Sequence, residues 1–240
     1  MTSKIKSNTL VWLFLCMGCI FFITSISSCG KASSTSAAGL NIEYEVLNLS
    51  PDLGTVNLYI NYNPVNTTPF YFGVNQGYFY VPSLPTTSIP YQFRSALSSG
   101  TPIFSIDSTL TPNTKYSLFI VGSAGPTLTQ IFTVDTTTVP GLGRAKVRFV
   151  DASPSGTGGF DLTANGAPVY SKIIYPNYSG WMALPVGNYD FQINATGNPA
   201  VLKDMPAITI QDGRLYTIYA YGYTNRIDSA AFNAGIITNR

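Results

Sequence analysis

An internal repeat of about 100 residues constrains the fold of this chain more than any other feature of its sequence. Four segments recur in the same order at offsets of 98 to 104 residues. The matched segments are Asn48–Pro51 with Asp151–Pro154, Val56–Tyr59 with Phe160–Thr163, Tyr91–Arg94 with Tyr189–Gln192, and Tyr116–Gly122 with Tyr216–Gly222. A period of this length fits two complete domains, because solenoid repeats are only about 20–50 residues long. We therefore expect two copies of one domain.

Apolar and polar residues alternate within each copy. The alternating segments are Ile42–Val46, Val56–Ile60, Ala145–Phe149 and Tyr189–Ile193. A period of two is typical of a half-buried β-strand, and no segment of helical length has a period of 3.6 residues. Turns rich in Gly, Pro, Asn and Asp separate the alternating segments. The sequence therefore predicts an all-β protein with two tandem antiparallel β-sandwich domains.

Composition shifts give the domain boundaries. We place the first β-sandwich at residues 40–135, a linker containing Pro140 and Gly141 at residues 136–143, and the second β-sandwich at residues 144–240. We expect residues 144–240 to fold alone. No cysteine follows Cys29, so both domains fold without disulfides.

The first 39 residues carry export signals. Lys4 and Lys6 precede an apolar run at residues 10–23, which is typical of a signal peptide. Ile26-Ser27-Ser28-Cys29 then resembles a bacterial lipobox, with Ile26 where that motif prefers Leu. We expect residues 1–28 to be removed, Cys29 to be lipidated, and residues 29–39 to form a flexible tether.

The apolar run has an alternative interpretation as an uncleaved anchor. Its 14 residues would cover about 21 Å as a helix, against a hydrocarbon core of about 30 Å. This short length favours the signal peptide. The predicted localisation is therefore the bacterial cell envelope, at the outer membrane, with the bilayer as a partner through the lipid.

Charge and chemistry exclude several function classes. Removal of Lys4 and Lys6 leaves 11 basic and 11 acidic side chains, so no basic excess favours nucleic acid. The chain contains no histidine, no nucleophile motif, no phosphate-binding loop and no zinc spacing. The sequence thus predicts a non-enzymatic protein without cofactor or metal. The alternative to a non-enzymatic protein is a carboxylate pair for glycoside hydrolysis, drawn from Asp151, Asp161 and Asp190. The favoured interpretation is that these residues cap turns or occupy outward strand positions.

A family resemblance covers most of the second copy and, more weakly, the first. It rests on Ala145–Pro154, an Asn165-Gly166 hairpin, Leu184–Phe191 and Gly213–Gly222, which together are similar to the domain-of-unknown-function family DUF4397. The first copy departs from the pattern, because Asn48 stands in the place of Asp151. The resemblance implies a β-sandwich, often in tandem and often on lipoproteins, and it supplies no catalytic residues.

Aromatic side chains are the one abundant resource for binding. Tyr175, Tyr178 and Trp181 lie around one turn, and the segments 70–72 and 78–80 are aromatic in the corresponding part of the first copy. Exposed rings stack on sugars, so this turn is a candidate glycan site. The alternative is that Trp181 belongs to a core, as aromatic residues of sandwich strands usually do.

The first strands of the two copies carry opposite charges on their outward faces. Glu43 and Glu45 alternate with apolar residues in one copy, and Lys146 and Arg148 do so in the other. These charges either keep edge strands apart or hold the two faces together.

Two functions remain compatible with the sequence. The first is a lipid-anchored adhesion, scaffold or interaction module of the envelope, which would have an envelope protein as its partner. The alternative is a glycan-binding lipoprotein of a polysaccharide uptake system.

Overall fold

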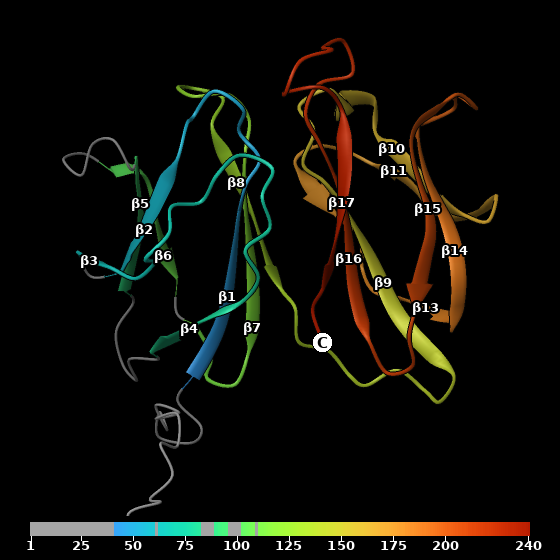
Figure 1. Cartoon of the computed structure of the whole chain (residues 1–240), viewed down its shortest axis with the longest axis horizontal. Helices are drawn as coiled ribbons and strands as arrows, with labels where there is room; N and C mark the ends of the chain where they lie inside the picture. The colour runs from blue at the N-terminus through green and yellow to red at the C-terminus, as the bar shows by residue number, and fades with distance from the viewer. Residues whose placement is uncertain (1–40, 61, 83–88, 96–101, 109) are drawn as a thin grey trace, which may run out of the picture. The chain divides into compact units, whose positions relative to one another are not determined.

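The fold is built almost entirely from β-strands (Figure 1). The computed structural model describes residues 41–60, 62–82, 89–95, 102–108 and 110–240. Within these ranges the chain forms strands and one short 3₁₀ turn, η1 (Gly156–Gly158), which confirms the predicted all-β class. In the described part of the chain, no helix has the length and hydropathy needed to cross a bilayer. The signal peptide, Cys29 and the tether lie outside the described residues and stay predictions.

The first copy is a sandwich of two four-stranded sheets, which we call its junction sheet and its distal sheet. The junction sheet has the order β4 (Phe79–Pro82), β1 (Asn41–Asn48), β7 (Lys115–Val121) and β8 (Thr129–Val134). The distal sheet has the order β3 (Asn63–Pro64), β2 (Val56–Ile60), β5 (Ile89–Ser95) and β6 (Pro102–Ser108).

The second copy repeats this arrangement strand by strand, which confirms the predicted pair of sandwiches. Its junction sheet has the order β12 (Asn177–Tyr178), β9 (Arg144–Asp151), β16 (Leu215–Tyr221) and β17 (Asn233–Thr238), and β13 (Met182–Pro185) also pairs with β9. Its distal sheet has the order β11 (Ala167–Ile173), β10 (Phe160–Ala164), β14 (Gly187–Ala195) and β15 (Val201–Ile210).

One strand pair in each copy differs from the predicted antiparallel pairing. β1 runs parallel to β7, and β9 runs parallel to β16, whereas the other pairs of described strands are antiparallel. Parallel neighbours need a long crossover, and here the whole distal sheet lies between them in the sequence. Alternation has the same period in both pairings, so it could not distinguish them.

Each sandwich has its own apolar core. Alternate residues of β1, among them Tyr44 and Val46, enter the first core, and alternate residues of β9, among them Val147 and Phe149, enter the second. This arrangement follows directly from the period of two in the sequence.

A third apolar cluster joins the opposite faces of the two junction sheets, and we call it the junction core. Its buried members are Leu47, Leu49, Phe119, Val121 and Ile131 from the first copy and Val150, Ala152, Tyr219 and Ile237 from the second. The Phe119 and Tyr219 ring centroids are 5.8 Å apart. Both faces of β7 and β16 are consequently buried. The expectation of half-buried strands is wrong in part for β1 and β9, because Glu45 and Arg148 on their outward faces are buried as well.

Candidate functional site

The predicted aromatic turn lies against the junction sheet of its own copy. Tyr178, in β12, keeps 43% of its surface exposed, and Trp181 is partly buried just before β13. The guanidinium carbon of Arg148 lies 4.6 Å from the centroid of the Trp181 ring and 6.0 Å from that of Tyr178. Trp181 is therefore not a core residue, because it is only partly buried. Its ring is also not freely available for stacking, because it contacts the buried guanidinium of Arg148.

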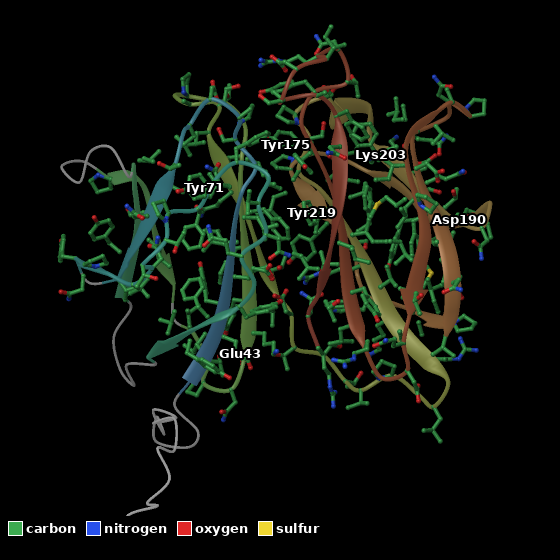
Figure 2. The ribbon with its side chains drawn as sticks, in the orientation of Figure 1. Glu43, Tyr71, Tyr175, Asp190, Lys203 and Tyr219 are labelled. Carbon is green, nitrogen blue, oxygen red and sulfur yellow. The ribbon has the colours of Figure 1, made fainter. Side chains whose placement is uncertain are left out.

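Tyr175 belongs to a different environment from the other two aromatic residues. It packs against the junction core, on the same side of the second sandwich as Tyr219 (Figure 2). Burial raises the pKa of its hydroxyl to about 12. The structure thus brings Tyr178 and Trp181 together around Arg148 and separates Tyr175 from them.

Arg148 is the centre of a buried polar network at the junction. Its side chain is 1% exposed, and an arginine this deeply buried almost always has polar partners. Its Nε donates to Thr217 at 2.8 Å, and its terminal nitrogens donate to the Val134 carbonyl and to Thr133, each at 2.9 Å. It also forms an ion pair with Asp135, which directly follows β8. Arg148 therefore links the two copies.

The carboxylate of Asp135 is held from several directions. Its second oxygen accepts hydrogen bonds from Tyr78 and Ser117, each at 2.6 Å. The Tyr78 hydroxyl accepts a further bond of 2.7 Å from Asn239, near the end of the second copy. Burial and the neighbouring Asp135 raise the pKa of Tyr78, so its hydroxyl keeps its proton. A buried polar network is stable only when each of its polar groups has a hydrogen-bond partner. Asp135, Tyr78, Ser117 and Asn239 each have one.

Glu45 adds a buried carboxyl group beside this network. Its side chain is completely buried, and neither oxygen forms a hydrogen bond of acceptable geometry. Burial, and then repulsion from Asp135, raise the pKa of Glu45 to about 8, and attraction to Arg148 opposes them. Glu45 is thus mostly protonated at neutral pH.

The oppositely charged faces meet, but their charges pair in a different way from the alignment. Arg148 pairs with Asp135, whereas its repeat partner Glu45 is left without an ion pair. Glu43 pairs with Lys115 of its own sandwich at 2.7 Å, and Lys146 donates to Thr138. The repeat offset predicted which faces carry charge, and the positions of β8 and the linker decided the partners.

The three candidate carboxylates hold the backbone in separate places. Asp161 accepts hydrogen bonds from the Lys172 amide and the Thr196 hydroxyl, each at 2.7 Å, and Asp190, on β14, accepts one from the Ala207 amide at 2.8 Å (Figure 2). Asp151 is buried at the end of β9 and accepts one from the Ser153 amide at 3.0 Å. In the described ranges, no cluster of three or more acidic or cysteine side chains is arranged to hold a metal ion.

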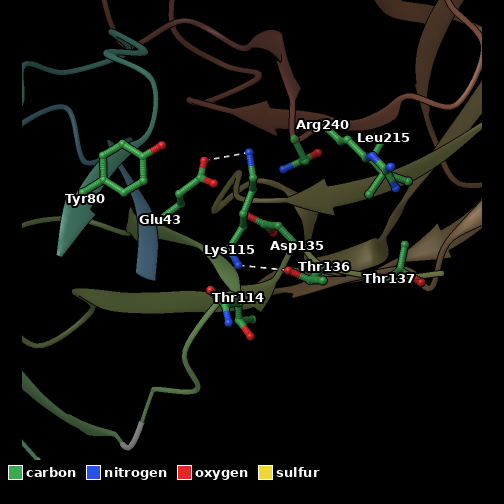
Figure 3. A pocket seen from close by; sticks show the side chains of 11 residues that line it. Glu43, Tyr80, Thr114, Lys115, Asp135, Thr136, Thr137, Leu215 and Arg240 are labelled. Atoms are coloured by element: carbon green, nitrogen blue, oxygen red, sulfur yellow. Dashed lines mark hydrogen bonds and ion pairs between the residues drawn. The ribbon is translucent and has the colours of Figure 1, made fainter. Parts of the chain in front are cut away.

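A hollow of about 430 Å³ opens beside the buried network (Figure 3). Glu43, Tyr80 and Lys115 of the first copy line it, together with Thr136 and Asn239. Sequence reasoning noted Glu43 for its charge and Tyr80 as part of an aromatic segment, and it missed Lys115. Only strand pairing brings the three side chains together, because they lie on β1, β4 and β7.

Comparison with known families agrees with the repeated fold. The model of DUF4397, a domain of unknown function, matches residues 43–157 and 155–238. No curated protein matches the chain. The first matched region contains the first sandwich and runs on through β9 of the second copy, the second region begins after β9, and together they cover nearly all the described residues. The predicted resemblance is confirmed, and the chain belongs to the DUF4397 family as two tandem domains.

Proposed function

We propose that this chain is a lipid-anchored protein of the bacterial cell envelope that acts as a non-enzymatic adhesion, scaffold or interaction module. The observation that carries the proposal is the junction core with its Arg148–Asp135 ion pair, which makes one unit of two sandwiches. A jointed pair of domains would lose ordering entropy when it binds, whereas a pair already fixed does not. A fixed pair therefore suits a module that binds a partner over both domains.

The anchor in this proposal is a lipid on Cys29. Two or three acyl chains, at about 0.8 kcal/mol per buried methylene, would hold the module on the bilayer. In a bacterial host fed labelled palmitate, we expect the full chain to take up the label and the Cys29→Ala variant to take up none. Equal labelling of the two chains would contradict the anchor.

The binding role is tested by the chemistry of the partner. Full chain incorporated into lipid vesicles is mixed with envelope fragments that have been treated with protease or with periodate, which destroys vicinal hydroxyls of sugars. A protein partner predicts that protease removes most of the binding and that periodate leaves most of it intact. Binding that protease does not diminish would overturn the adhesion or scaffold role.

The alternative is a glycan-binding lipoprotein of a polysaccharide uptake system, for which the same experiment gives the opposite result. Its support, the aromatic turn, is weakened because Trp181 and Tyr178 surround Arg148 and Tyr175 packs elsewhere. A turn already in use for packing has less ring surface to offer a sugar.

A further inference from the structure

The hollow is lined by residues of both copies, and its first-copy side combines three kinds of side chain that can bind a polar ligand with a flat face. An exposed tyrosine, Tyr80, an acid, Glu43, and a base, Lys115, converge on it (Figure 3). Its volume of about 430 Å³ falls within the range of small-molecule sites, about 300–1,000 Å³. The hollow therefore has room for a ligand of one to a few rings.

The acid and the base present an acceptor and a donor side by side. Glu43 and Lys115 occupy the same level of the parallel pair β1–β7, and their charged atoms are 2.7 Å apart. Their side chains remain 31% and 30% exposed. A carboxylate has about four acceptor sites and an ammonium has three donors, so one ion pair leaves most of this capacity available. Adjacent hydroxyl groups, each both donor and acceptor, match such a pair.

Tyr80 supplies a flat surface beside the ion pair. It stands opposite Glu43 in the register of β1 and β4, and 69% of its surface is exposed. A tyrosine ring has an apolar face and a polar hydroxyl tip. This combination suits a ligand with one apolar face and a rim of hydroxyls, as in a pyranose ring.

The fold does not require these three residues. At the same register positions of the second copy, Lys146 replaces Glu43, Leu215 replaces Lys115 and Ala183 replaces Tyr80. The second sandwich forms the same strand pairs without an acid or an aromatic ring there. The matched copy thus separates what the sandwich needs from what the first copy adds.

The floor of the hollow is rigid. Asp135 and Asn239 are completely buried and line it, and both are held by the network around Arg148 and Tyr78. A site whose supporting groups are already fixed loses little entropy when a ligand binds.

We propose that this hollow is a saccharide-binding site, in which Tyr80 stacks on a sugar ring while Glu43 and Lys115 bind two adjacent hydroxyls. The site goes beyond the proposed role as an envelope module, because its chemistry is the same whether or not the chain carries a lipid. Its failure would leave the anchoring at Cys29 and the protein partner untouched.

The test uses the full chain, solubilised in detergent, on an array of neutral and uronic-acid oligosaccharides. We expect at least one series to bind with a dissociation constant of about 1 mM or tighter. For that oligosaccharide, Tyr80→Ala and Lys115→Leu, which introduce the residue types of the second copy, should each weaken binding about tenfold or more. Affinity is measured by titration calorimetry, and the melting temperature of each variant is recorded.

Tyr71→Ala is the matched control, because Tyr71 is also an exposed tyrosine, at 46%, and does not line the hollow. It should bind as the unmodified chain does. The proposal is overturned if no oligosaccharide binds, or if Tyr80→Ala and Lys115→Leu bind as tightly as Tyr71→Ala. Binding that is lost in Trp181→Ala and kept in Tyr80→Ala would assign the sugar to the aromatic turn instead.

Discussion

The two copies share a fold but carry complementary side chains at matched positions of the junction. Where the first copy has Glu45, the second has Arg148, and the register places Tyr78 of the first copy at the position of Trp181 in the second. The Tyr78 hydroxyl donates a hydrogen bond to Asp135, and Trp181 lies on Arg148, so the two aromatic residues flank one ion pair. The difference teaches that the two faces are specialised to fit each other.

A second matched pair differs in charge but not in place. The side-chain Nδ2 of Asn48 donates a hydrogen bond to the Gly54 carbonyl at 2.7 Å, and the side-chain Oδ1 accepts one from the backbone amide of Ser50. Asp151 accepts the equivalent bond from Ser153, but its other oxygen has no partner. Burial raises the pKa of Asp151 to about 8. The position therefore favours a neutral side chain in both copies.

Separating the copies should have the largest effect. Residues 144–240 alone would expose Val150, Tyr219 and Ile237, each worth about 1.5–3 kcal/mol when buried, and would leave Arg148 without Asp135. We expect this fragment to melt well below residues 30–240 or to self-associate. Circular dichroism and sedimentation check this expectation. A monomer with an unchanged melting temperature would mean that the junction contributes no stability.

Breaking the ion pair comes next. Arg148→Ala should lower the free energy of unfolding of residues 30–240 by about 3–5 kcal/mol, because it leaves Asp135 buried without its cation. Urea unfolding measures the change. Arg144→Ala, at an exposed position of the same strand, is the control and should change stability by less than about 0.5 kcal/mol. Similar losses in the two variants would contradict a special role for Arg148.

Asp151→Asn, which gives the second copy the residue type of Asn48 in the first, should change the pH dependence of the free energy of unfolding. Because the folded pKa is about 8 and the ordinary value is 3.8, the folded state holds the proton more tightly. The resulting stability is full below pH 4 and is lost as pH rises towards 8, by at most about 1.4 kcal/mol per pH unit.

Asp151→Asn should remove this slope and should be more stable than the unmodified protein at pH 8. Urea unfolding at several pH values between 5 and 8 is the measurement. Glu45 contributes a slope of the same sign, so Glu45→Gln is the parallel variant. A slope that is unchanged in Asp151→Asn would show that the carboxylate is charged in the folded state over this pH range.

Uncovering the cation should have the smallest effect. Trp181→Ala removes the ring that lies 4.6 Å from the Arg148 guanidinium, and a cation–π contact is worth about 0.5–2 kcal/mol. We expect a small fall in melting temperature in residues 30–240, followed by differential scanning calorimetry. Trp181→Phe, which keeps a ring, should recover part of it. An unchanged melting temperature in Trp181→Ala would show that the ring does not stabilise the fold, and it would favour a role for Trp181 in glycan binding.

Much of each sandwich was predictable, because alternation is a local property of the chain. The pattern Ile42, Tyr44, Val46 correctly indicated which face of β1 enters the first core. The opposite face could not be assigned in this way, since Leu47 and Glu45 become buried only when the other copy covers them. The parallel pairing of β1 with β7 was missed for a related reason, because it joins residues about 70 positions apart.

The candidate site was also predictable only in part. The sequence indicated Trp181, Tyr178 and Glu43 because of their aromatic or charged side chains, but it gave no reason to expect Lys115 and Tyr80 to lie close together. Their meeting depends on the order β4-β1-β7, which the turn signals do not encode.

By itself, the sequence determined that this protein repeats one domain twice, that the domain is a β-sandwich, and that opposite charges occupy matched strands. These are consequences of side-chain period and turn chemistry, which act between near neighbours. Only the tertiary structure decided that Arg148 pairs with Asp135, that Glu45 and Asp151 lose contact with water, and that Tyr80 stands over a hollow. Burial and partner choice depend on which surfaces are brought together in space, and that is a property of the folded chain as a whole.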